Sequence, residues 1–522
     1  MQGGAASGVV GYWTSKSVRA AQALALAAGA AAFSGTARAD DAGASAATEI
    51  SGVTVTAARP PLDHDTGLAT ALTTVQGTPQ AISVIDQAQL KAQGVASLEQ
   101  ALRNVPGITI AIGEGGTLNG DQFKIRGFDA KDDVYVDGLR DFGAYTRDSF
   151  NYEEVQVLKG PSGAMFGRGT TGGAINTVSK TPRLEDRASL DAYAGAGDYY
   201  RALADINLRL GETTAARLNL MASSTGVVDR DLIRSQRWGA ALSVGFGLGA
   251  DTALTASYLH QFDRRRPDYG VIIVQRPGDL TALPATEYGV GVERSSFLGF
   301  RNDLDRSTAD IVTVRLTHAV SNKLTLTSDT RYGAYARYFQ YTTLDQCGAA
   351  CTAALFDNNP ATEATGGIGG SSPYDSDVWG LQNISTARFD DSLGRLRNQA
   401  ILGIDLSRQA NDKLFYAYTL PPGITTRPNM PHPIVDPDPT FPAGYTVFRA
   451  VPGQNIACPQ TGNCTTTLGG SAVSTNVAGS GTLESRGEST DLGAFVTDRL
   501  WLTKALSVIG QPAGGPLHGQ AR

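Results

Sequence analysis

Cysteine, histidine, methionine and tryptophan are all scarce in this chain of 522 residues, which has four Cys, five His, four Met and four Trp. The Cys form two close pairs set among Gly, Thr, Asn and Pro, namely Cys347/Cys351 and Cys458/Cys464. In an exported chain this pattern favours two local disulfides, Cys347–Cys351 and Cys458–Cys464, in surface loops. The alternative, a zinc site, needs added ligands, and the His lie far away in sequence. We therefore expect neither a directly bound metal nor a covalent cofactor.

Long apolar runs are also missing. After the N-terminus no stretch has the roughly 18 consecutive apolar residues of a membrane-spanning helix. The net charge of −6 gives no reason to expect nucleic-acid binding. The motifs G-x-S-x-G and H-E-x-x-H are both absent, which argues against a hydrolase. The sequence thus predicts a protein that is not an enzyme.

The N-terminus has the pattern of a secretory signal peptide. Lys16 and Arg19 precede an apolar run over residues 20–33, and Ala37 and Ala39 are the small residues of a cleavage site. The apolar run is too short to span a bilayer. We expect cleavage after Ala39, so that residues 1–39 are removed and the mature protein is secreted, periplasmic or an outer-membrane barrel.

Glycine is abundant, with 61 residues, and is concentrated in residues 159–180 (KGPSGAMFGRGTTGGAINTVSK). A phosphate-binding P-loop places its Lys after the second Gly and continues into a helix. Here Lys159 precedes the glycines, and residues 174–179 read as a short strand. The segment is therefore better interpreted as a set of turns in which only Gly tolerates positive φ.

Two regions with different patterns follow the signal peptide. Residues 40–74 look flexible and contain a short β-prone segment, residues 50–56, suited to strand addition on a partner. Residues 75–182 predict a compact α+β domain, in which 86–89 and 97–100 resemble capping boxes that open short helices. We expect its strands at residues 108–112, 123–126, 134–137, 155–158 and 174–179.

After Pro182 apolar and polar residues alternate strictly, as in residues 202–210 and 238–248. About ten such segments occur between residues 187 and 500, each near the roughly ten residues of a tilted membrane strand. Short turns alternate with three long connections, residues 264–307, 342–377 and 410–485. This asymmetry is typical of an outer-membrane barrel. A soluble β-sandwich or propeller is the alternative, but sandwich strands are usually shorter.

The chain resembles TonB-dependent outer-membrane receptors for ferric siderophores, most of all those of the catecholate type. The matching segments cover most of residues 50–182 in the family's order. They are TPQAISV (78–84), LEQALRNVPGI (98–108), IRGF (125–128), YVDGL (135–139) and the glycine-rich segment 159–180.

This resemblance implies an N-terminal plug domain inside an antiparallel transmembrane β-barrel of about 22 strands, in the outer membrane of a Gram-negative bacterium. It implies active uptake of an Fe(III)-siderophore by strand addition to TonB, which ExbB and ExbD energise from the inner-membrane proton gradient. The TonB box would be Ile50, Ser51, Gly52, Val53, Thr54, Val55 and Thr56. Arg126 and Arg168 match plug arginines that pair with barrel glutamates in the family, and we expect them to anchor the plug.

An anionic ferric complex suits a site of cations and aromatic rings at the plug apex and in the outer loops. Two segments have this composition, RDFGAYTRD in the plug and RRRPDYG in the first long loop. The candidate ligand-binding residues are Phe142, Tyr145, Arg147, Arg264, Arg265, Arg266 and Tyr269.

The C-terminus departs from the family pattern. After about ten strands, residues 505–510 read as the start of another, and residues 511–522 lose the alternation. We expect a partial barrel over residues 187–510, an aberrant tail over 511–522, and impaired insertion into the outer-membrane lipid. Other hypotheses remain open: a TonB-dependent receptor for haem or cobalamin, or a secreted carbohydrate-binding or adhesive β-protein.

Overall fold

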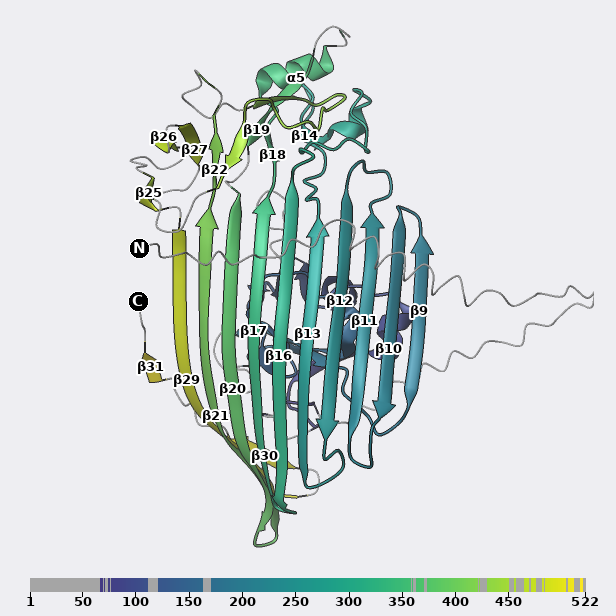
Figure 1. The fold of residues 1–522 in the computed structure, drawn as a ribbon, viewed down its shortest axis with the longest axis vertical. Helices are drawn as coiled ribbons and strands as arrows, with labels where there is room; N and C mark the ends of the chain where they lie inside the picture. The colour runs from purple at the N-terminus through teal and green to yellow at the C-terminus, as the bar shows by residue number, and fades with distance from the viewer. Residues whose placement is uncertain are drawn as a thin grey trace, which may run out of the picture.

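The protein has two parts, an N-terminal domain over residues 66–180 and a long curved sheet that begins at Arg187 (Figure 1). The computed structural model describes residues 66–519 with gaps. The gaps are residues 69, 71–73, 76, 111–120, 163–169, 358, 360–362, 370–372, 421, 423–429, 450–454, 457–463, 469–470, 476–480, 483, 504–505 and 511–516.

The N-terminal domain is built on a five-stranded sheet in the order β1-β7-β8-β5-β6. These strands are β1 (Ala81–Asp86), β7 (Tyr152–Lys159), β8 (Gly173–Ser179), β5 (Val134–Val136) and β6 (Leu139–Arg140). The pair β5 and β8 is parallel, whereas its other pairs are antiparallel. A smaller sheet contains β2 (Ile108–Ile110), β3 (Phe123–Ile125) and β4 (Phe128–Asp129). Each strand expected in this domain is present, with slightly different ends.

Two short helices, α2 (Gln87–Ala92) and α3 (Leu98–Leu102), begin at the expected capping residues. The Asp86 carboxylate accepts a hydrogen bond from Gln89 N at 2.7 Å, and Ser97 Oγ accepts one from Gln100 N at 3.3 Å. The Gln100 side chain in turn accepts a hydrogen bond from Ala96 N. Amide groups at both helix N-termini are thereby satisfied.

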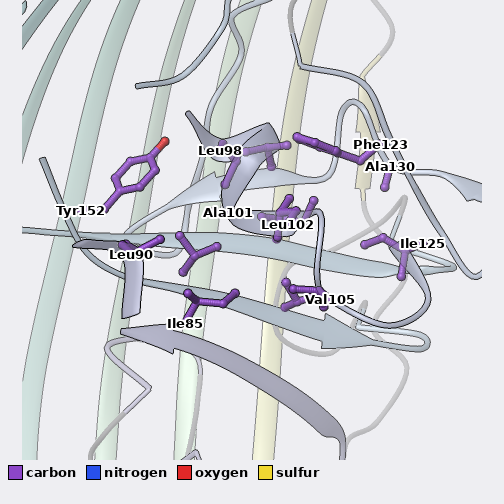
Figure 2. Close-up of a cluster of buried hydrophobic side chains, with 14 residues drawn as sticks. Ile85, Leu90, Leu98, Ala101, Leu102, Val105, Phe123, Ile125, Ala130 and Tyr152 are labelled. Carbon is purple, nitrogen blue, oxygen red and sulfur yellow. The ribbon is translucent and has the colours of Figure 1, made fainter. Parts of the chain in front are cut away.

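The domain's main core lies between these helices and the two sheets. Leu98, Leu102, Phe123 and Ile125 point toward one another in Figure 2, and all four are fully buried. Burying side chains of this size contributes about 1.5–3 kcal/mol each. This core fixes the position of the segments that lead to the long sheet.

Glycines in the segment 159–180 permit close backbone approach, as the sequence predicts. A Cβ on Gly173 would lie 2.1 Å from the carbonyl oxygen of Leu158, and a Cβ on Gly172 would lie 2.5 Å from that of Ile125. Gly173 begins strand β8, so that a strand follows the glycines and not the helix of a P-loop. Gly163, Gly167 and Gly169 lie outside the described residues.

The long sheet has ten long antiparallel strands among the described residues, the number expected between residues 187 and 500. Their order follows the chain from β9 to β29, and the shorter β30 and β31 both pair with β29. The strands are β9 (Arg187–Gly195), β10 (Tyr199–Arg209), β11 (Ala215–Gly226), β12 (Arg234–Phe246), β13 (Thr252–Arg265), β16 (Leu304–Ser321), β17 (Leu324–Gln340), β20 (Tyr374–Leu393), β21 (Leu396–Phe415), β29 (Glu484–Trp501), β30 (Ser507–Gly510) and β31 (Leu517–Gly519).

The two faces of this sheet differ in character. The inward face touches the N-terminal domain, through residues such as Arg201, Gln261 and Arg331. The outward face exposes apolar side chains. They include Leu220, Leu242, Phe246, Leu254, Val312, Val314, Leu316, Leu402, Ile404, Leu406, Leu492 and Val496. Period-two alternation therefore separates a polar inner surface from an apolar outer one.

Membrane-spanning helices are not found in the described part of the chain, since none of its helices combines enough length with enough apolar character.

The long connections gather at one end of the sheet and the short turns at the other (Figure 1). Small elements occupy the long connections. They are β14 (Ile273–Val274), β15 (Leu283–Pro284), η3 (Ala285–Tyr288), β18 (Thr343–Gln346), α5 (Ala349–Phe356), β19 (Thr365–Gly369), β22 (Ala417–Thr419), β23 (Met430–Pro433), β24 (Thr446–Phe448), β25 (Asn455–Ile456), β26 (Cys464–Leu468), β27 (Ser471–Thr475) and β28 (Gly481–Thr482). A disulfide joins Cys347 to Cys351 at α5. The Cys458–Cys464 pair involves residues outside the described part.

Two features of the sheet differ from expectation. β20 and β21 have 20 residues each, so that they run well past the roughly ten residues needed to cross a bilayer and shorten the expected loops. Residues 517–519 of the expected aberrant tail form β31 beside β29, because backbone pairing needs no apolar alternation.

Candidate functional site

The loop that follows β6, residues 141–148 (the apical loop), meets the inward face of the long sheet. Arg147 is 3% exposed and lies between two carboxylates. Its Nε donates to Asp141 Oδ2 at 2.8 Å, and its Nη1 donates to Asp121 Oδ2 at 3.3 Å. The Tyr145 ring lies 4.7 Å below its guanidinium, and Nη2 donates to the Gly143 carbonyl. The loop is therefore held by a buried, fully partnered cation.

The two carboxylates beside Arg147 differ in pKa. Burial raises the pKa of Asp121 to about 6, and the charge of Arg147 only partly opposes this. Burial also acts to raise the pKa of Asp141, but Arg147 and a hydrogen bond from Tyr335 outweigh it, so that the pKa falls below its usual value. Asp141 therefore stays ionised while Asp121 can take up a proton in mildly acidic solution.

Aromatic contacts join the apical loop to β17 and β20. Tyr335 OH donates to Asp141 Oδ1 at 2.5 Å, and its ring stacks on Tyr145 with 5.7 Å between the centroids. Phe142 lies against β20, where a Cβ on Gly380 would meet its ring at 2.1 Å. Gly380 thus leaves the space that the Phe142 ring fills.

A hollow of about 490 Å³ opens between the apical loop and the strands β20, β21 and β29. Lys131, Arg140 and Phe142 line it from the N-terminal domain, whereas Gln409, Asn411, Glu488 and Ser489 line it from the sheet. Its volume falls within the range of small-molecule sites. Cations, an aromatic ring and polar groups converge there, although the carboxylates of Asp121, Asp132 and Asp141 also line it, the first and last of them paired with Arg147.

Asp148, at the end of the apical loop, forms a second link to the sheet. Its carboxylate accepts hydrogen bonds from Arg201 at 2.6 and 2.9 Å and from Arg237 at 3.1 Å. Arg237 also pairs with Asp263 at 2.7 Å. The Asp148 side chain is completely buried, so this network bridges the domain and strands β10, β12 and β13 where little water can compete.

The turn between β5 and β6 forms a third link. Arg331 of β17 donates to the carbonyl oxygens of Val136 and Leu139 and lies 3.4 Å from the Asp137 carboxylate. Asp137 and Gly138 both have positive φ, as a two-residue hairpin turn requires. Arg331 is 1% exposed, so the turn supplies the acceptors that this buried guanidinium needs.

Ion pairs of both polarities join the domain to the sheet. Carboxylates of the domain, those of Asp137 and Asp148, meet arginines of the sheet, while Lys91 and Lys180 of the domain meet Asp191 and Asp205 of the sheet. The anchoring of the domain by Arg126 and Arg168 through barrel glutamates stays a prediction. Arg126 is exposed in a hairpin turn with φ of 52°, and no ion pair of Arg126 occurs among the described residues. Arg168 lies outside them.

The seven candidate ligand residues do not converge on one surface. Phe142 alone lines the hollow, because Tyr145 and Arg147 are buried in the apical loop. Arg265 faces inward and pairs with Asp305, whereas Arg264 is exposed on the outward face. The other two lie above β13: Arg266 donates to the carbonyls of Leu232 and Arg301, and Tyr269 stacks on Tyr341.

Sequence reasoning missed the acidic partners and the cations of the hollow. Asp121 is far from Arg147 in sequence. Asp141 lies in the segment RDFGAYTRD, whose cations and aromatic rings suggested ligand binding, and its carboxylate carries no separate signal there. Lys131 and Arg140 carried the one signal that could have identified them, a positive charge within the segments that flank the motif YVDGL.

Residues 74–174 match the family model described as the TonB-dependent Receptor Plug Domain. The catecholate siderophore receptor Fiu of Escherichia coli K12 is 37% identical over 263 residues, which are 49% of this chain and 35% of that protein. The probable TonB-dependent siderophore receptor PiuA of Acinetobacter baumannii is 30% identical over 339 residues, or 64% of this chain and 44% of that protein. The chain thus spans less than half the length of these curated relatives.

Solved structures agree with this match. A crystal structure of the ferric-catecholate import receptor Fiu in its closed form superposes with a TM-score of 0.69 at 27% identity, covering 85% of this chain and 57% of that one. The domain that meets the inward face of the sheet corresponds to the plug, and the sheet to part of the barrel wall. The chain therefore contains a TonB-dependent receptor plug domain over residues 74–174, followed by a run of antiparallel strands similar to part of the barrel wall of these receptors.

Proposed function

We propose that the protein is an outer-membrane receptor that takes up ferric siderophores by TonB-gated active transport. The observation that carries this proposal is the hollow of about 490 Å³ at the apical loop of a plug domain. The hollow lies between the plug and the barrel strands, so a ligand there would touch the part that has to move. No chemical bond of the ligand has to change, and the protein acts as a transporter.

The chemistry of the hollow suits an anionic Fe(III) complex with aromatic ligand rings. Lys131 and Arg140 supply positive charge, and the ring of Phe142 offers a face on which a catechol can stack. Catecholate siderophores combine both properties, and the name of Fiu, a catecholate siderophore receptor, agrees with this choice. Haem and cobalamin are the alternatives, because both are also large and partly planar.

The buried links between plug and sheet support gating by a mechanical pull. The links involve Asp137, Asp141 and Asp148 of the plug, and each of these contacts must break or rearrange if the plug moves relative to the sheet. The force would come from TonB, energised by ExbB and ExbD, acting on residues 50–56. These residues, the proposed TonB box, lie outside the described part of the chain.

A binding panel tests this proposal. The purified protein is titrated with a ferric catecholate, a ferric hydroxamate, haem and cobalamin, and quenching of its intrinsic fluorescence is followed. We expect saturable binding of the ferric catecholate with the highest affinity. Preferential binding of haem or cobalamin would support the alternative receptor class, and binding of none of the four would contradict the proposal.

A further inference from the structure

Two arginines lie directly opposite each other on the outward face of the long sheet. Arg264 of β13 pairs in register with Arg306 of β16, and both side chains are exposed. Four residues along the same face, His260 of β13 contacts Asp310 of β16 at 2.8 Å, which confirms the register and the face. Like charges directly opposite each other on one face of a sheet repel and are destabilising.

A third arginine joins this pair. Tyr338 of β17 pairs in register with Arg306. The guanidinium groups of Arg306 and Arg449 each lie 5.9 Å from the centroid of the Tyr338 ring. We call Arg264, Arg306 and Arg449 the outward arginine cluster. None of the three forms an ion pair within the described part of the chain. Arg264 is thus the neighbour of Arg306, which shares the Tyr338 ring with Arg449, and none of these three positive charges has an ion-pair partner among the described residues.

Two carboxylates of the outward face near the cluster, those of Asp310 and Asp375, have other partners. Asp310 accepts a hydrogen bond from Tyr258 OH at 2.6 Å and contacts His260, and it lies four residues, about 13 Å, from Arg306 along the strand. Asp375 of β20 pairs in register with Tyr338 and accepts a hydrogen bond from Tyr416 OH. Neither of these two carboxylates forms an ion pair with the cluster, which leaves its charge to be compensated from elsewhere.

The position of the cluster indicates which anion it meets. Two aromatic side chains, Trp238 and Phe262, lie on the outward face two residues nearer the short turns than Gln236, Arg264 and Arg306. The next paired residues on this face include His260 and Asp310, and beyond them the face continues into the apolar residues Leu242, Val312 and Val314. Aromatic residues of this kind mark the boundary between hydrocarbon and headgroups in membrane barrels. The arginines are therefore at headgroup depth, on the side of the long loops.

We propose that the outward arginine cluster binds the phosphate group of a lipid in the outer leaflet. This rests on the proposed location of the sheet in the outer membrane, but not on the identity of the transported ligand. Planar guanidinium groups suit bidentate contacts to phosphate oxygens, and a shared phosphate would relieve the repulsion between Arg264 and Arg306. The acyl chains would lie along the apolar face below.

The test measures lipid retention by the full chain purified in a non-ionic detergent. Phosphatidic acid and phosphatidylcholine with the same acyl chains are added, and the bound lipid is measured by native mass spectrometry. We expect preferential retention of phosphatidic acid, and a loss of about tenfold or more in the double variant Arg264→Gln/Arg306→Gln. Equal retention by the variant and the original chain would overturn the proposal.

A matched control removes the same charge from arginines that have carboxylate partners. Arg234 pairs with Asp198 at 2.7 Å and Arg408 with Glu488 at 3.5 Å, and both arginines are exposed on the outward face. We expect Arg234→Gln/Arg408→Gln to retain phosphatidic acid within about twofold of the original chain, because these charges are already compensated. An equal loss of phosphatidic acid retention in this control would show that retention depends on net charge alone, and it would contradict a specific site.

Two further measurements separate this site from other anion sites. Inorganic phosphate at millimolar concentration should leave lipid retention unchanged; displacement of the lipid would assign the cluster to free anions and overturn the lipid assignment. Ferric catecholate binding should also be the same in Arg264→Gln/Arg306→Gln. A loss of ferric-complex binding with unchanged lipid retention would indicate that Arg264 contributes to siderophore binding and would overturn the lipid assignment. Failure of the original chain to bind any siderophore would leave the lipid result standing.

Discussion

At the scale of residues, charge pairs that are buried between plug and sheet distinguish this protein from a simple β-structure. Capping residues such as Ser97 could be predicted from the sequence, since a capping box involves only neighbouring positions. Arg147 could not be placed, because its role depends on Asp121, which is 26 residues away. An Arg in a segment rich in Arg and aromatics looks the same whether it binds ligand or holds a loop.

Asp148 offers the sharpest test of these buried pairs. The substitution Asp148→Asn keeps an acceptor for the Phe150 amide but leaves Arg201 and Arg237 without their shared charge. Removal of one partner of a buried pair costs about 3–5 kcal/mol. We expect hydrogen exchange to show a loss of protection of that order in η2 (Ser149–Asn151) and β7.

The control for this prediction is Glu99→Gln, which removes a carboxylate from the exposed pair between Glu99 and Arg103. Exposed pairs contribute less than about 1 kcal/mol, so protection should change little. Similar losses of protection in both variants, or none in Asp148→Asn, would show that the Asp148 network does not hold the plug against the sheet.

Asp121 predicts a dependence of plug stability on pH. Its pKa is raised from 3.8 to about 6 in the folded protein, so the folded state binds a proton that the unfolded state does not hold between these values. The stability of the plug should therefore be highest near pH 4 and fall as the pH rises to 6, by roughly 3 kcal/mol at most. Below pH 4 the protonation of Asp141 and Asp148 opposes this trend, because their pKa values are lowered.

Hydrogen exchange of the Leu98 amide, which donates to the Arg147 carbonyl at 2.9 Å, reports this change after correction for the intrinsic exchange rate. The variant Asp121→Asn cannot titrate at this position, and we expect a smaller slope between pH 4 and pH 6, which Asp133 retains because burial also raises its pKa to about 6. A variant that retains the full slope would show that another group is responsible.

At the scale of elements, period-two alternation identified the strands, while the ends of the strands escaped prediction. Each barrel strand has one apolar and one polar face, a pattern that no helix produces. β20 and β21 extend past the apolar belt with polar residues on both faces, such as Asn411 on one face and Asp412 on the other. There the sequence reads as loop, and only pairing between neighbouring strands keeps the backbone extended.

Gly173 tests the element that follows the glycine-rich segment. The substitution Gly173→Ala places a Cβ 2.1 Å from the Leu158 carbonyl oxygen, at a φ of 144° that L-residues rarely adopt. The clash is with backbone, so no side-chain rotation relieves it, and we expect a loss of at least about 2 kcal/mol. Protease resistance of the plug, measured on outer-membrane fractions, should fall sharply.

Gly211→Ala is the matched control for Gly173→Ala, since its Cβ would meet Thr214 at an ordinary 3.7 Å and its φ is not in the left-handed region. Its protease resistance should equal that of the original chain. A resistant Gly173→Ala plug would mean that β7 and β8 do not approach as closely as the structure places them.

At the scale of the whole molecule, the plug and the sheet together make the proposed ligand site. The segments 98–108 and 135–139 identified the domain from sequence because their turns and core residues are close together in the chain. The hollow could not be predicted in the same way, because it needs the register of β20, β21 and β29 against the apical loop. Phe142 was selected for its chemistry, and its position beside Gly380 follows only from the assembled structure.

The measurement that tests the central claim most directly is the affinity of a ferric catecholate for the original chain, for Phe142→Ala and for the control Phe128→Ala. Phe128 is exposed on the same domain but does not line the hollow. We predict that Phe142→Ala weakens binding about tenfold, through loss of ring stacking, and that Phe128→Ala stays within about twofold. Equal affinity of all three proteins would contradict a siderophore site at the apical loop.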